Sequence, residues 1–77
     1  MDPSQTRPLS TVKPGQTVRL VAINAGRGLN SRLASMGLVP DVEITVLSNN
    51  HPGPFMITVK NSRVMLGRGM AQKMLVT

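Results

Sequence analysis

The chain has 77 residues and no cysteine, so we expect one small domain without disulfides, a thiolate metal site or a thiol nucleophile. Nine Lys and Arg against three Asp and Glu give a formal net charge of +6, which favours an anionic partner such as nucleic acid, a phospholipid surface or an acidic protein face. Phe55 is the only aromatic residue, which argues against base stacking. No apolar run approaches the roughly 20 residues of a membrane span, and the first ten residues lack the apolar core of a signal peptide.

The N-terminal part predicts a tail and a first strand. Residues 1–8 are polar, contain two prolines and are interpreted as a flexible tail. A Pro-Gly turn signal then precedes a strand expected over residues 17–23. Val18, Leu20 and Ala22 would share its inner face, because alternate residues of a strand point the same way.

The next stretch, GRGLNSRLASMGL, predicts a helix of about three turns. Leu29, Leu33 and Met36 are spaced i, i+4 and i+7 and would form one apolar stripe. Gly37 stands where a left-handed residue ends a helix, and Pro40 prevents the helix from resuming.

Alternation returns after this helix. Val42, Ile44 and Val46 are expected to point inward from a second strand, which the turn-rich NNHPGP ends. A hairpin follows, and its inward residues are expected to be Phe55, Ile57, Val59, Val64 and Leu66.

The hairpin turn is expected at Asn61-Ser62, which would place Lys60 opposite Arg63. Like charges across a strand pair repel. The two side chains would therefore either spread into water or bind an anion between them.

The last segment predicts a short helix over residues 69–73 and a final strand at the C-terminus. Together the elements predict an all-β fold with short helices: a small β-barrel of about five strands, with one helix after the first strand and a helical turn before the last. Closure is favoured over an open sheet because it removes exposed strand edges. Residues 9–77 are assigned to this single domain.

Gly-Arg-Gly occurs twice, before each predicted helix, and both copies admit two interpretations. Neither has the Gly-Lys-Ser/Thr of a P-loop or the third glycine of a dinucleotide-binding turn. As plain helix starts, the glycines would serve as N-caps with positive φ. Arg27 and Arg68 would then lie at the positive end of a helix dipole, where a bound anion would relieve the repulsion.

Few residues are of the types that carry out catalysis or bind a metal or cofactor. His51 is the only histidine and is interpreted as a solvated loop residue, so no metal site and no cofactor are expected. Met36, Met70 and Met74 are expected to fill the core. With no Cys, no Tyr and one His, the chain is not expected to be an enzyme.

Met56 and Met65 point outward in this alternation, with Lys60 and Arg63 beside them. Exposed methionines form adaptable contact surfaces. This face is therefore either a protein-binding surface or a face covered by the tail or by a helix.

Three stretches, PLSTVKPGQTVRLVAI, RLASMGLVPDVEITVL and VKNSRVMLGRGMAQKMLV, resemble the FeoA family, and the resemblance covers about residues 8–77. It implies an SH3-like barrel and a cytoplasmic accessory protein that binds the FeoB-type ferrous iron transporter, which carries a GTP-binding domain. This role supports or regulates Fe(II) uptake, without binding iron as substrate or hydrolysing GTP. A related barrel occurs in iron-dependent repressors of the DtxR type. The family often has Gly where this chain has Asp41.

The main hypothesis is therefore a protein-binding accessory module that reaches the membrane only through the transporter and is a monomer or self-associates weakly. Its expected contact residues are Arg27, Arg32, Met56, Lys60, Arg63, Met65 and Arg68. The alternatives are a small basic barrel that binds nucleic acid, which the missing aromatics disfavour, and a regulatory SH3-like domain acting in trans.

Overall fold

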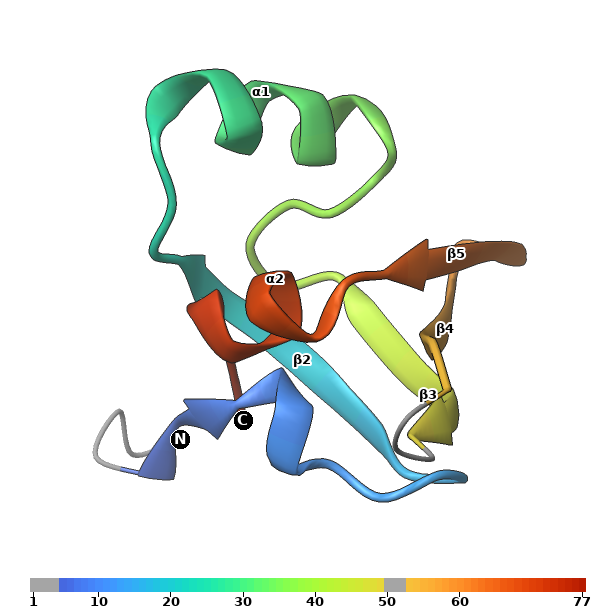
Figure 1. Ribbon diagram of the computed structural model, residues 1–77. Helices are drawn as coiled ribbons and strands as arrows, with labels where there is room; N and C mark the ends of the chain where they lie inside the picture. The colour runs from blue at the N-terminus through green and yellow to red at the C-terminus, as the bar shows by residue number, and fades with distance from the viewer. Residues whose placement is uncertain (1–4, 50–52) are drawn as a thin grey trace.

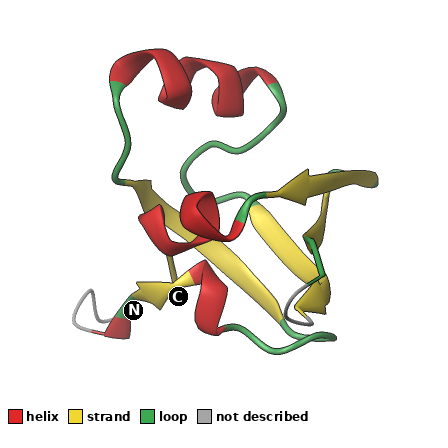
Figure 2. Ribbon diagram, viewed as in Figure 1, coloured by secondary structure: helices red, strands yellow, loops and turns green. Residues whose placement is uncertain are grey.

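The computed structural model describes residues 5–49 and 53–77, and its elements follow the predicted order with two short additions at the N-terminus (Figure 1). The strands are β1 (Arg7–Pro8), β2 (Thr17–Ile23), β3 (Glu43–Asn49), β4 (Phe55–Val59), β5 (Ser62–Leu66) and β6 (Met74–Val76). The helices are the 3-10 turn η2 (Leu9–Thr11), α1 (Arg27–Ser35) and α2 (Arg68–Lys73). Figure 2 shows α1 standing to one side of the sheet, while α2 lies close to the strands.

The strands form one antiparallel sheet of six strands in the order β1-β6-β2-β3-β4-β5. The small, mostly-β fold is confirmed, but the expected closure is not found, because the two end strands β1 and β5 do not pair with each other. The added strand β1 has only two residues, and one of them is Pro8, which has no N–H to donate. This short strand therefore cannot extend the hydrogen-bond ladder to close the sheet.

The N-terminal segment is part of the sheet earlier than the sequence suggested. Arg7 and Pro8, assigned to the tail, pair with Val76 and Leu75 of β6. Leu9 directly after them is fully buried. The ordered domain thus begins before residue 9, and residues 1–4 lie outside the described part of the chain.

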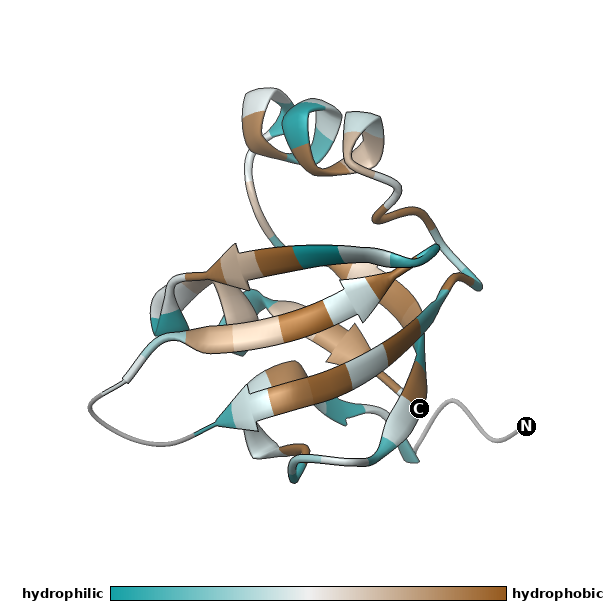
Figure 3. Ribbon diagram, turned by 90° about the vertical axis from the view of Figure 1, so that its right-hand side faces the viewer, coloured by the Kyte–Doolittle hydropathy of each residue, from teal (hydrophilic) through white to brown (hydrophobic). Residues whose placement is uncertain are grey.

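The core lies inside the curve of the sheet, and the predicted alternation of β3, β4 and β5 is confirmed. Buried residues alternate with half-buried ones along β4, and Figure 3 shows that these strands are largely apolar, with polar residues interspersed. Sixteen apolar residues are buried in the described chain: Leu9, Val12, Val18, Leu20, Leu33, Leu38, Ile44, Val46, Phe55, Ile57, Val59, Val64, Leu66, Ala71, Met74 and Val76. Met74 fills the core as predicted, and Met70 packs against it while partly buried.

A β-bulge overturns one prediction in β2. Val18 and Leu20 are buried as expected, but Ala22 is exposed. The register with β6 shifts between Leu20 and Ala22, and an extra residue in a strand reverses which face the following side chains occupy. Two-residue periodicity alone cannot locate such a shift.

Helix α1 ends as predicted at Gly37, which has a φ of +93°. The Gly37 N–H donates to the Ala34 carbonyl and the Leu38 N–H donates to the Leu33 carbonyl, which is the Schellman arrangement. This turn brings buried Leu38 back beside buried Leu33. Met36, predicted to be in the core, is instead 45% exposed, because Leu38 occupies the buried position.

The β4–β5 turn also differs from the prediction. Val59 pairs with Ser62, so the two turn residues are Lys60 and Asn61, with φ values of +49° and +66°. Positive φ at both positions is the type I′ geometry that suits the right-handed twist of a hairpin. Arg63 therefore lies opposite Thr58 and not opposite Lys60, and the predicted repulsion between two paired cations is absent.

Candidate functional site

The outer surface of the β4–β5 hairpin gathers three of the predicted contact residues. Met56 pairs with Met65 and Thr58 pairs with Arg63, so these four side chains share one face, here called the hairpin face. Met65 is 67% exposed, while Met56 is half-buried. Within residues 5–49 and 53–77, neither a helix nor residues 5–8 bury Met65.

Beside the hairpin face, the sheet forms an open polar hollow of about 290 Å³. Its lining residues are Val42, Glu43, Thr45, Thr58, Lys60 and Asn61. Lys60, predicted as a contact residue, lies here in the turn and is exposed. The Glu43 carboxylate lies 3.6 Å from the Arg19 guanidinium, and both side chains are largely exposed, so this ion pair contributes little to stability.

Arg27 and Arg32 are exposed on α1, a different element from the hairpin. Arg27 lies on the same side of the helix as Asn30 and Ala34, because residues three and seven apart share a helical face. Arg32 falls on another side, away from that group. The two arginines therefore do not form a pair.

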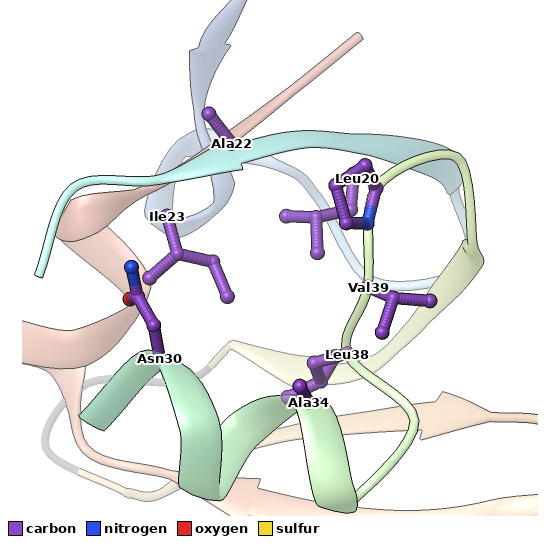
Figure 4. Close-up of a pocket in the computed structure, with 8 residues that line it drawn as sticks. Leu20, Ala22, Ile23, Asn30, Ala34, Leu38 and Val39 are labelled. Carbon is purple, nitrogen blue, oxygen red and sulfur yellow. The ribbon is translucent and has the colours of Figure 1, made fainter. Parts of the chain in front are cut away.

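Asn30 and Ala34 help to line an apolar pocket of about 200 Å³ between α1 and β2 (Figure 4). The other lining residues are Leu20, Ala22, Ile23, Leu38, Val39 and Pro40. The Asn30 Oδ1 atom is buried and accepts no hydrogen bond. The apolar lining suits an aliphatic group.

Arg68 differs from the other predicted contact residues because it is engaged within the fold. Its Nη1 donates a hydrogen bond of 2.8 Å to Asn49 Oδ1. The Asn49 Nδ2 in turn donates to the carbonyls of Ser10 and Val12, at 3.1 and 2.8 Å. The Arg68 Nε and Nη2 atoms are buried without a partner. Arg68 thus ties the start of α2 to β3 and to the segment around η2, and it is not an exposed contact residue.

The two Gly-Arg-Gly copies serve the same structural purpose. Gly26 and Gly67 are the N-caps of α1 and α2, and Arg27 and Arg68 are the first residues of these helices. The predicted positive φ is wrong, since Gly26 and Gly67 have φ values of −63° and −68°. No side chain caps either helix. Both copies are helix starts, as the simpler interpretation held.

The predicted contact residues therefore do not form one site. Met56, Arg63 and Met65 lie together on the hairpin, Lys60 lies at its tip, Arg27 and Arg32 lie on α1, and Arg68 is held inside. Residues 5–49 and 53–77 contain no group of three His, Asp or Glu side chains able to hold a metal, and His51 falls outside them. In the same residues no helix is long and apolar enough to cross a membrane.

Sequence reasoning missed two features, Asn49 and the apolar pocket. Asn49 is the first residue of the turn-rich NNHPGP and was interpreted as part of the turn, although its side-chain amide joins three segments. The pocket depends on α1 lying over β2, and no local pattern signals such a contact.

The chain matches the FeoA domain family over residues 7–77. A relative from Methanocaldococcus jannaschii, named "Putative Fe(2+) transport protein A", is 39% identical over 69 residues, which is 90% of this chain and 83% of that protein. The crystal structure of the iron uptake regulatory protein FeoA matches with a TM-score of 0.85 and 36% identity, covering 94% of this chain and 96% of that one.

The fold also occurs inside longer proteins. A manganese-dependent transcriptional repressor matches with a TM-score of 0.83 and 26% identity, over 94% of this chain but only 41% of the repressor. The matched family spans nearly the whole sequence, and the FeoA crystal structure matches along almost its full length. The chain belongs to the FeoA family.

Proposed function

We propose that this protein is a cytoplasmic accessory protein of a ferrous iron uptake system, and that it binds a FeoB-type transporter through the hairpin face. Membership of the FeoA family supports the iron transport context. We take it to act by binding, since the sequence has no Cys, no Tyr and a single His from which a catalytic site could be built.

The observation that carries the choice of surface is Met65. A methionine exposed by 67% in the middle of a strand leaves apolar area in water that a partner can cover. Arg63 on the same face and Lys60 at the turn add positive charge on the side of Met65 that leads to the hairpin tip. A complementary partner surface is therefore apolar at its centre and acidic at its rim.

The nucleic-acid alternative has less support. The formal net charge of +6 suits a phosphate backbone. Phe55, however, is fully buried in the core, so the single aromatic ring is not available to stack on a base.

The test is calorimetric titration of the protein into the full-length transporter and into its isolated GTP-binding domain, each with GDP and with a non-hydrolysable GTP analogue. We expect binding in the micromolar range or tighter to at least one of the two. A dependence on the nucleotide would mean that the protein senses the state of the GTP-binding domain.

Two charge reversals locate the surface. Arg63→Glu should weaken binding at least tenfold without lowering the melting temperature, because Arg63 is exposed and lies opposite uncharged Thr58. Arg7→Glu is the matched control, since it makes the same charge change on β1 at the other end of the sheet. Equal losses of affinity in both variants would mean that binding depends only on the net charge of the protein and not on the hairpin face. No binding by the wild type, together with salt-sensitive binding of an oligonucleotide, would favour the nucleic-acid alternative.

A further inference from the structure

Strand β5 ends the sheet and pairs only with β4. In Figure 3 it is the outermost strand of the β3-β4-β5 side, above β4 in that view. The other end strand, β1, is blunted by its two-residue length and by Pro8. β5 has five residues and no proline, so it presents a longer open edge.

The hairpin register identifies which backbone groups lie on this edge. Val59 and Ser62 flank the two-residue turn and form a hydrogen-bonded pair, and such pairs alternate along an antiparallel ladder. Val64 and Leu66 therefore also bond to β4. Arg63 and Met65 direct their N–H and C=O groups away from β4, and none of these four groups makes a hydrogen bond within the described residues.

An open edge of this kind can accept an added strand. An extended segment placed beside β5 would satisfy two donors and two acceptors at once. Its outward side chains would lie next to those of Arg63 and Met65, which are both exposed on the hairpin face.

The charge of the hairpin indicates which kind of segment would pair with β5. The hairpin from residue 55 to residue 66 carries Lys60 and Arg63 and no acidic residue. A second copy of the protein would place two sets of these cations on one face, and each copy has a formal net charge of +6. An acidic strand would instead neutralise them.

We propose that β5 binds an extended acidic segment of a partner protein by strand addition, with carboxylates near Arg63 and Lys60 and an apolar side chain near Met65. The inference rests on the proposed function only in taking the occupant to be a protein. It adds the mode of binding, which is main-chain pairing at an edge in addition to side-chain contact on a face.

The test uses a synthetic octapeptide of alternating Glu and Val, with an octapeptide of alternating Lys and Val as control. Amide hydrogen exchange of the protein is followed by NMR with each peptide. In the free protein, Val64 should exchange slowly, while Arg63 and Met65 exchange fast because their N–H groups face solvent. The Glu peptide should slow exchange at Arg63 and Met65 at least tenfold, and the Lys peptide should not.

Two variants separate backbone pairing from side-chain contact. Met65→Pro removes an edge N–H that makes no bond to β4, and it should weaken binding of the Glu peptide at least tenfold. Met65→Thr keeps that N–H and has good strand propensity but loses part of the apolar contact, so it should weaken binding of the Glu peptide clearly less than Met65→Pro does. If the proline variant fails to fold, exchange in the wild type still decides the question.

Unchanged exchange at Arg63 and Met65 with saturating Glu peptide would overturn the inference. Slowed exchange that grows with protein concentration in the absence of peptide would also overturn it, in favour of a second copy. Both readouts are independent of the transporter. Slowed exchange with the Glu peptide alongside failure to bind the transporter would therefore refute the proposed function while supporting strand addition.

Discussion

Replacing Gly37 by alanine should lower the free energy of unfolding, and the size of the loss should depend on the backbone conformation of residue 37. Gly37 ends α1 with a φ of +93°. A Cβ placed there would lie 3.5 Å from Val59 Cγ1 and 3.6 Å from Lys60 Cδ, which is ordinary contact distance. The methyl group therefore meets no clash, and the cost arises from the backbone alone.

A residue with a Cβ loses about 1–2 kcal/mol in a left-handed conformation. Replacing Gly by Ala also removes freedom from the unfolded chain, which returns about 0.4–1 kcal/mol. The net loss for Gly37→Ala should be about 1 kcal/mol, which corresponds to a fall in melting temperature of roughly 4–8 °C for a domain of this size. Gly37→Asn should lose less, because asparagine tolerates this conformation better than alanine.

Urea denaturation followed by circular dichroism is a suitable assay, since the chain has no Trp or Tyr to report by fluorescence. Gly28→Ala is the matched control. Gly28 lies within α1, its φ is not positive, and a Cβ there would meet nothing within 4 Å. The same added methyl group should leave the stability unchanged or raise it by up to about 1 kcal/mol. Midpoints that shift equally in both variants, or a Gly37→Ala midpoint at or above the wild-type value, would contradict the assignment of the cost to φ.

Substitutions at three further positions test other features by the same denaturation assay. Arg68→Ala should lower stability by about 2 kcal/mol, because it removes the charged hydrogen bond to Asn49 and leaves that amide oxygen without a donor. Both variants remove the buried donors that have no partner, so Arg68→Met should be less harmful than Arg68→Ala only because it keeps an aliphatic stem of similar length; equal midpoints would contradict this. Asp41 has a φ of +73°, so Asp41→Ala should cost about 1 kcal/mol while Asp41→Gly should be neutral or stabilising. Asn61→Gly should preserve or raise stability, and Asn61→Val should lower it by at least about 1 kcal/mol, because a β-branched residue resists the positive φ of the turn; a stable valine variant would mean that the turn can rearrange.

The candidate surface could be predicted only in part. Outward placement of Met65 followed from two-residue alternation along the hairpin, and the structure confirms it. The role of Arg68 did not follow, because an arginine at a helix start gives no local sign that an asparagine 19 residues earlier accepts its hydrogen bond. The open edge of β5 was not predicted either, since closure of the barrel was expected.

Local sequence patterns were enough to predict the elements that are determined by interactions between residues close in sequence. The alternation of Val42, Ile44 and Val46 and the glycine at position 37 predicted a strand and a helix end, because side-chain periodicity and backbone sterics act over a few residues. Motifs along the chain were also enough to indicate the family. The exposure of Ala22 and the turn at Lys60 and Asn61 depended on tertiary structure. In both places more than one register keeps the apolar residues on a buried face, and only pairing with β6 and between β4 and β5 selects among them.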